Sequence, residues 1–308
     1  MIIAFCRPCR DSSRKSAGWR VFSVARLVAV AMALGGLWTA PASADDATRQ
    51  AYYERSMVLV AHERCRLFQP GVQRALQVAA LQTRGVLLRA GHEEASVNTI
   101  AARARRDANA LACTDTDLQT RANRIVHAFE RWGRAARLDF PARQHSWRVD
   151  RFQHQETGWR LVQDSRVGRS PVRFGLAGTS PSMVRPTVVI SFPGRSRPYA
   201  ARLVMRDARQ LSQAHGVADG QALMPPVSGR VMVLASGRDQ AAEPLLAEGQ
   251  RSGEAWVFGE DAMARLVQLD PREPFWIEFL FHDDSIARVP FEVGDVAAAQ
   301  AFLGLGPV

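Results

Sequence analysis

The chain has 308 residues and carries 40 basic against 30 acidic side chains. Its only lysine is Lys15, so residues 45–308 contain no lysine at all. This part of the chain therefore excludes enzymes that need a phosphate-loop lysine, a Schiff-base lysine or a Ser-x-x-Lys acylation site.

Residues 1–44 have the three parts of a secretory signal peptide. Basic residues dominate positions 1–26, and an apolar run follows at 27–40. Ala42-Ser43-Ala44 then places small residues at the two positions that a signal peptidase reads. A retained membrane anchor is the alternative, but this apolar run is shorter than the roughly 20 residues that span a bilayer. We predict cleavage of residues 1–44, a periplasmic or secreted protein, and no transmembrane segment in the mature chain.

Residues 45–136 are predicted to form a helical bundle domain. Four stretches repeat apolar residues at three- and four-residue spacing, and turn or capping residues separate them. Their short connections favour an antiparallel bundle, in which the first and third helices run parallel. Cys65 and Cys113 would then lie at the same end. We predict a disulfide between them, because the periplasm is oxidising; a thiol active site is the alternative.

Residues 137–308 are predicted to form a mostly antiparallel β-sandwich domain with short helices. Apolar and polar residues alternate in several short segments, with turn-forming residues between them. We expect residues 187–192 and 199–205 to form a hairpin through 193–196, and residues 283–285 to form a tight turn between the last two strands. Short helices are predicted near 260–269 and 295–303. The fold class is therefore α+β, with a disulfide-stapled antiparallel helical bundle before the sandwich.

The order of elements near the C-terminus carries a family resemblance. Its motifs are Gly-Arg-Val-Met-Val at 229–233, Ala-Trp-Val-Phe at 255–258, a helix at 260–266, Phe-Trp-Ile-Glu-Phe at 275–279 and Val-Pro-Phe-Glu-Val-Gly at 289–294. Residues 228–305 thereby resemble the C-terminal module of invasion-associated locus B-type exported proteins of α-proteobacteria. Such modules often carry disulfide cysteines, whereas this chain has none after Cys113. The resemblance implies a β-sandwich in the cell envelope and assigns no functional residue.

Charge changes sign along the second domain. Residues 137–209 hold 14 Arg and 5 acidic residues, a net charge of +9, whereas residues 210–308 hold 6 Arg and 14 acidic residues, a net charge of −8. A basic surface can attract an anionic partner, and arginine with aromatic rings is a common binding mixture. The candidate partner-binding residues are Trp147, Arg148, Arg151, Trp159, Arg160, Arg166 and Arg169. The alternative is that these arginines form an ordinary solvent face, which the acidic segment neutralises.

His282-Asp283-Asp284 is the best candidate for a metal or acid–base site. Three potential ligands are adjacent, but Asp-Asp-Ser at 283–285 is also typical of a tight turn, because these side chains bond to their own backbone. The sequence has no HExxH motif, no pair of His and Cys with zinc-ligand spacing and no Gly-x-Ser-x-Gly elbow. We predict no cofactor.

These observations favour a non-enzymatic exported envelope protein that binds or supports a protein or an anionic envelope partner. Nucleic acid is not an expected partner in that compartment. The main alternative is a periplasmic hydrolase or metal-dependent enzyme that uses His282, Asp283 and Asp284. A structural role in envelope integrity without a discrete ligand is the third hypothesis.

Overall fold

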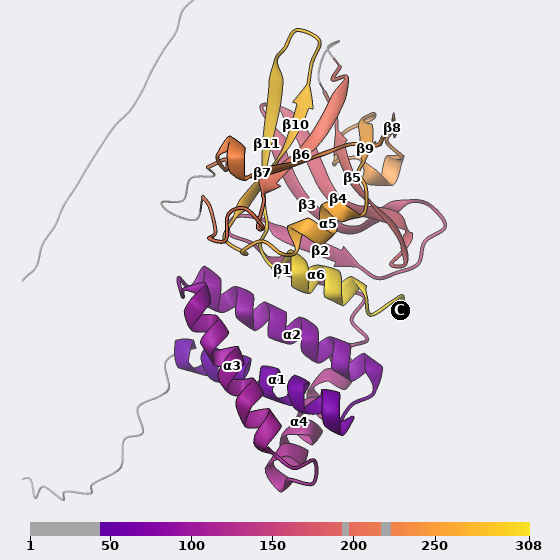
Figure 1. The fold of residues 1–308 in the computed structure, drawn as a ribbon. Coiled ribbons are helices and arrows are strands. Elements are labelled where there is room, and N and C mark those ends of the chain that lie inside the picture. Colours follow the sequence, from indigo (N-terminus) through magenta and orange to yellow (C-terminus); the bar gives the residue numbers. More distant parts are fainter. Residues whose placement is uncertain (1–43, 193–196, 217–222) are drawn as a thin grey trace, which may run out of the picture. The chain divides into compact units, whose positions relative to one another are not determined.

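Four helices begin the described part of the chain, and two antiparallel sheets follow. The computed structural model describes residues 44–192, 197–216 and 223–308. The predicted signal peptide lies outside the described residues, apart from Ala44. The helical region comprises α1 (Ala44–Cys65), α2 (Pro70–Arg89), α3 (Glu94–Ala110) and α4 (Thr116–Trp132) (Figure 1).

Local chemistry explains where these helices begin. Pro70 starts α2, where its missing N–H costs nothing, because the first N–H groups of a helix have no partner within the helix. Asp115 caps α4, since its Oδ1 accepts the Leu118 N–H at 2.9 Å. The apolar stripes of the helices meet in one cluster, which includes Val58, Leu76, Ala104 and Leu118. The four predicted helices are confirmed.

The disulfide between Cys65 and Cys113 is present, as predicted. Cys65 is the last residue of α1, and Cys113 follows the end of α3, with 5.4 Å between the two Cα atoms. Arg64 reinforces the same end, because its Nη2 donates to the Ala108 carbonyl at 3.1 Å. The first and third helices therefore share an end, as the parallel arrangement requires.

Residues 137–308 form two antiparallel sheets, which confirms the α+β class. One sheet has the order β1-β2-β3-β4-β5-β9-β8, and the other has the order β11-β10-β6-β7. The strands of the first sheet are β1 (Arg137–Pro141), β2 (Ser146–Asp150), β3 (Gly158–Val167), β4 (Ser170–Ser180), β5 (Met183–Ile190), β8 (Gly237–Gln240) and β9 (Glu254–Val257). The strands of the second are β6 (Ala200–Arg206), β7 (Arg230–Leu234), β10 (Pro274–Leu280) and β11 (Ile286–Glu292).

One hydrophobic cluster holds the inner faces of both sheets. Trp147 and Phe174 contribute from the larger sheet, and Phe275 and Phe291 contribute from the smaller one. All four side chains are at most 1% exposed. Burying aromatic side chains of this size contributes a large part of the apolar stabilisation of a core.

The two sheets also touch along β3 and β11. The Glu292 N–H donates to the Gln163 side-chain oxygen at 2.8 Å, and the Ser165 hydroxyl donates to the Pro290 carbonyl at 2.6 Å. β2 pairs with only the first half of β3, so the second half of that edge is free to meet β11.

The predicted hairpin between residues 187–192 and 199–205 is wrong. β5 pairs with β4 and β9 in the larger sheet, whereas β6 pairs with β10 and β7 in the smaller sheet. The chain therefore crosses between sheets here. By contrast, the predicted turn between β10 and β11 is confirmed, since these strands pair over their whole length around residues 281–285.

Helix α6 (Val296–Leu303) joins the sheets to the helical region, where it contacts α2 (Figure 1). The Phe302 ring lies 5.3 Å from Trp132 and 5.6 Å from Phe140, centroid to centroid. The described residues from Ala44 to Val308 form one compact unit. In the described ranges, no helix is both long and apolar enough to cross a membrane.

Candidate functional site

Two adjoining cavities lie on the outer face of the larger sheet. The first has a volume of 560 Å³ and lies over β1, β2, β3 and the loop between β2 and β3. The second, of 670 Å³, lies beside the hairpin that joins β3 to β4. Segment 244–250 borders both, and Arg148 and Arg173 line both. We call the two cavities together the arginine groove; its six arginines are Arg137, Arg148, Arg160, Arg166, Arg169 and Arg173.

Strand alternation brings the groove arginines to one face. In β2, Trp147 and Val149 point into the core, so Arg148 between them points outward. In the β3–β4 pair, Asp164 lies directly opposite Arg173, and both line the groove. The same face of β1 presents Arg137 and Asp139, which pair in register with Asp150 and Arg148.

Asp164 holds two of the arginines in fixed positions. Its Oδ2 accepts the Arg148 Nη1 at 2.8 Å, and its Oδ1 accepts the Arg173 Nε at 2.9 Å. Partial burial raises the pKa of Asp164, but the hydrogen bonds from both arginines outweigh this effect, so the pKa lies below its ordinary value. Arg173 also donates to the Leu246 carbonyl at 2.7 Å, which fastens segment 244–250 to the sheet.

Asp150 organises the first cavity in the same way. It accepts the Arg137 Nε at 3.1 Å and the Phe152 N–H at 2.8 Å, and Arg160 Nη1 lies 3.6 Å away. Arg160 occupies an irregular position in β3, where the pairing register shifts between Trp159 and Leu161. Its side chain is only 4% exposed, and this burial lowers the pKa of Arg160. Arg160 therefore supports the wall of the groove.

Arg166 and Arg169 are the two uncompensated cations of the groove. Both are exposed at the β3–β4 hairpin, whose two-residue turn begins with Gly168 at a φ of 55°. Within the described ranges, neither guanidinium makes a hydrogen bond or an ion pair. The second cavity thus has four arginines against two carboxylates, Asp164 and Glu248.

Five of the seven predicted partner-binding residues lie in the arginine groove. Arg148, Trp159, Arg160, Arg166 and Arg169 line the groove, although Trp159 is only 8% exposed and donates its Nε1 to the Leu245 carbonyl at 3.0 Å. Trp159 therefore acts as a support for segment 244–250.

Trp147 and Arg151 do not belong to the surface, which corrects their assignment as partner-binding residues. Alternation places Trp147 on the inward side of β2, and Arg151, which directly follows β2, lies on the same side. Trp147 is fully buried and donates its Nε1 to the Val293 carbonyl at 2.9 Å. Arg151 is 3% exposed and donates to the Gly133 and Gly306 carbonyls, each at 2.8 Å. Burial lowers the pKa of Arg151.

The acidic half of the domain neutralises some arginines, but outside the groove. Arg202 pairs with Glu278 at 2.6 Å, Arg206 with Glu273 at 2.7 Å and Arg197 with Glu254 at 3.2 Å. The first two pairs lie on the smaller sheet and in the loop before β10, whereas Glu254 belongs to β9 of the larger sheet. The hypothesis of mutual neutralisation is thus correct for those arginines, whereas Arg166 and Arg169 have no such partner among the described residues.

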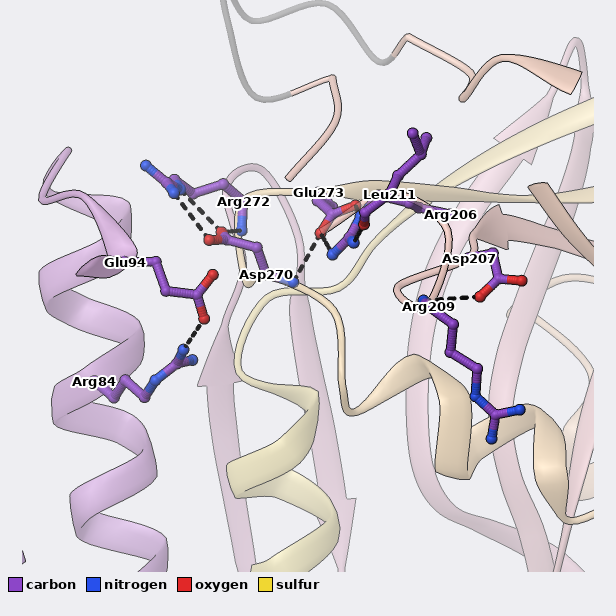
Figure 2. Close-up of polar contacts among 9 residues, drawn as sticks. All are labelled: Arg84, Glu94, Arg206, Asp207, Arg209, Leu211, Asp270, Arg272 and Glu273. Atoms are coloured by element: carbon purple, nitrogen blue, oxygen red, sulfur yellow. Dashed lines mark hydrogen bonds and ion pairs between the residues drawn. The ribbon is translucent and has the colours of Figure 1, made fainter. Parts of the chain in front are cut away.

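A second concentration of charge lies around the loop before β10 and is structural (Figure 2). Arg206 forms a two-point pair with Glu273, with both distances at 2.7 Å and both side chains at most 4% exposed. The hydrogen bond to Glu273 raises the pKa of Arg206. Arg272 forms an equally direct pair with Asp270. Because the charges of these two pairs are mutually satisfied, they fix the loop.

His282-Asp283-Asp284 forms an exposed turn. Asp283 Oδ1 accepts the Ser285 N–H at 3.1 Å and its hydroxyl at 2.6 Å, and Asp284 adopts a φ of 61°. The His282 ring stacks on Tyr199, with 4.9 Å between centroids. These hydrogen bonds lower the pKa of Asp283. Among the described residues, no group of three His, Cys, Asp or Glu side chains is arranged to hold a metal ion.

Sequence reasoning missed the carboxylates of the groove. Asp150 and Asp164 position four of its arginines, and Asp139 and Glu156 line the first cavity with no hydrogen bond or ion pair in the described part of the chain. The cross-strand pairing of Asp164 with Arg173 could have identified one of these carboxylates, but this pairing depends on the register between β3 and β4.

No protein-family model, no curated protein and no solved structure matches this chain.

Proposed function

We propose that this protein is an exported, non-enzymatic envelope protein that binds an anionic polymer along the arginine groove. The observation that carries the proposal is the pair of uncompensated guanidiniums, Arg166 and Arg169, in the same groove as four arginines that Asp150 and Asp164 position. Guanidinium groups bind carboxylate, sulfate and phosphate groups through two parallel hydrogen bonds, which suits such a ligand.

The fixed positions of the groove arginines favour a ligand-binding surface over an ordinary solvent-exposed charged surface. Asp164 fixes Arg148 and Arg173, and Asp150 fixes Arg137 and Arg160, so these side chains lose little freedom when a ligand arrives. Arg166 and Arg169 then supply the charge that attracts the ligand. Two adjoining cavities with several cations favour a polymer over a single small anion.

Placement in the envelope draws on separate observations. The Cys65–Cys113 disulfide suits an oxidising compartment, and residues 1–44 have the composition of an export signal. The resemblance of residues 228–305 to an exported envelope module agrees with this compartment. In this proposal the four helices form a disulfide-stapled bundle, and the two sheets form the β-sandwich that carries the groove.

Affinity chromatography on a dextran sulfate resin tests the proposal. Wild-type protein should be retained and should elute at a defined salt concentration, whereas Arg166→Glu combined with Arg169→Glu should elute at a clearly lower concentration. Arg185→Glu combined with Arg209→Glu is the matched control, because it changes the net charge equally at exposed arginines outside the groove. Equal loss of retention in both double variants would contradict the proposal, since only net charge would then matter.

A further inference from the structure

The two cavities of the groove differ in their free charged groups. In the second cavity, the charged groups without a hydrogen bond or ion pair to a described residue are the guanidiniums of Arg166 and Arg169 and the exposed carboxylate of Glu248, so cations are in excess there. In the first, the carboxylates of Asp139 and Glu156 are exposed and make no hydrogen bond or ion pair with any described residue. A ligand that occupies both cavities must therefore satisfy cations at one end and carboxylates at the other.

This contrast restricts the chemistry of the ligand. A peptide or inorganic polymer with a negative charge on every unit would bring its own anions against Asp139 and Glu156, and like charges repel at close range. Hydroxyl groups, by contrast, donate hydrogen bonds to carboxylates, and such bonds are stronger than those between neutral groups. Gln155 and His154 add further polar groups to the same cavity.

We infer that the groove binds an anionic polysaccharide in which charged and uncharged sugars alternate, with an anionic group beside Arg166 and Arg169 and a hydroxyl-bearing neutral sugar beside Asp139 and Glu156. This inference rests on the proposed function and names the class of its ligand. Arg148 and Arg173 line both cavities and thus form the passage between the two subsites. Asp164 holds both arginines in place, so it is a positioning residue for the ligand.

The test compares two probes with the same number of carboxylates. A hyaluronan octasaccharide carries four glucuronates that alternate with uncharged amino sugars, and an N-acetylated tetraglutamate amide carries four adjacent carboxylates. Binding of each probe to the purified protein is measured by calorimetry at constant ionic strength. We expect the octasaccharide to bind at least about tenfold more tightly than the peptide, because it can place the hydroxyl groups of an uncharged sugar beside the carboxylates of the first cavity, whereas the peptide carries a carboxylate on every unit.

Two double variants separate this inference from the proposed function. Asp139→Asn combined with Glu156→Gln should weaken octasaccharide binding about tenfold and should leave peptide binding equal or tighter. Arg166→Glu combined with Arg169→Glu should weaken both probes. All four side chains are exposed, so these variants should fold.

Three results would overturn the inference or the proposal beneath it. If the carboxylate variant binds both probes more tightly, or if the wild-type protein does not bind the octasaccharide, the alternating polysaccharide is the wrong ligand class. The proposed function can survive either result, because dextran sulfate retention tests it separately. If the arginine variant binds both probes as well as the wild-type protein does, the groove is not an anion site at all.

Discussion

Arg89, the last residue of α2, forms a two-point ion pair with Asp295, the residue before α6. The Nη2–Oδ2 distance is 2.9 Å, and the carboxylate is 2% exposed. Burial raises the pKa of Asp295, and Arg89 offsets part of that rise. This pair fastens the helical region to the sheets beside the contact between α2 and α6 (Figure 1).

Replacing Gly85 should break this ion pair. An added Cβ atom at Gly85 would lie 1.9 Å from Asp295 Oδ1, which no side chain tolerates without movement. Gly85→Ala should therefore lower the free energy of unfolding by about 3 kcal/mol, because Asp295 would be left buried without its partner. Gly71→Ala is the control in the same helix, since nothing lies within 4 Å of its added Cβ. Urea unfolding that gives equal stability for both variants would contradict this account.

The Cys65–Cys113 disulfide closes a sequence separation of 48 residues. Cys65→Ser combined with Cys113→Ser should lower the free energy of unfolding by about 4 kcal/mol, on the model in which the bond restricts the unfolded chain. Thermal unfolding with and without reductant provides the measurement. Reductant should lower the melting temperature of the wild-type protein and should leave that of the double variant unchanged. If complete reduction leaves the wild-type melting temperature unchanged, the disulfide does not contribute to stability.

Glu278 should make stability depend on acid pH. Its carboxylate is 3% exposed and accepts Arg202 Nε at 2.7 Å and Arg288 Nε at 2.8 Å. Burial acts to raise the pKa of Glu278, but the hydrogen bonds from both arginines lower it below the ordinary value of 4.5. The stabilisation is therefore fully present above about pH 4.5 and is lost as the pH falls through the lowered folded value.

Glu278→Gln isolates that contribution. The variant should be less stable than the wild-type protein by about 2 kcal/mol at pH 7, and the difference should shrink as the pH falls below 4.5. Asp164→Asn provides a comparison, because its carboxylate also has a lowered pKa but is 44% exposed, so its effect should be smaller. A difference between Glu278→Gln and the wild-type protein that stays constant from pH 7 to pH 3 would contradict the assignment.

The helical region could be predicted from sequence because its signals are local. Apolar spacing, Pro70 at the start of α2 and the capping Asp115 each act within one or two turns. The disulfide followed from the parallel direction of α1 and α3. The turn between β10 and β11 was equally local, since Asp283 bonds to Ser285 two residues away.

Strand partners and the composition of the groove could not be predicted, because they depend on residues far apart in the chain. β5 and β6 are consecutive in the chain, but β5 pairs with β9 in the larger sheet and β6 pairs with β10 in the smaller sheet. Arg151 shows the same difficulty on a smaller scale. Its position in the alternation is inward, and the carbonyl groups that accept its hydrogen bonds come from Gly133 and Gly306. No pattern in β2 or in the residues that follow it identifies these distant acceptors.

The salt dependence of dextran sulfate binding tests the central claim most directly. Arg166→Gln combined with Arg169→Gln should reduce the slope of log affinity against log salt concentration by about 2, because two cation–anion contacts no longer release counterions. Arg185→Gln combined with Arg209→Gln carries the same net charge change outside the groove and should keep the wild-type slope. If the first double variant retains the wild-type slope and affinity, Arg166 and Arg169 do not contact the polymer, and the arginine groove is not the binding site.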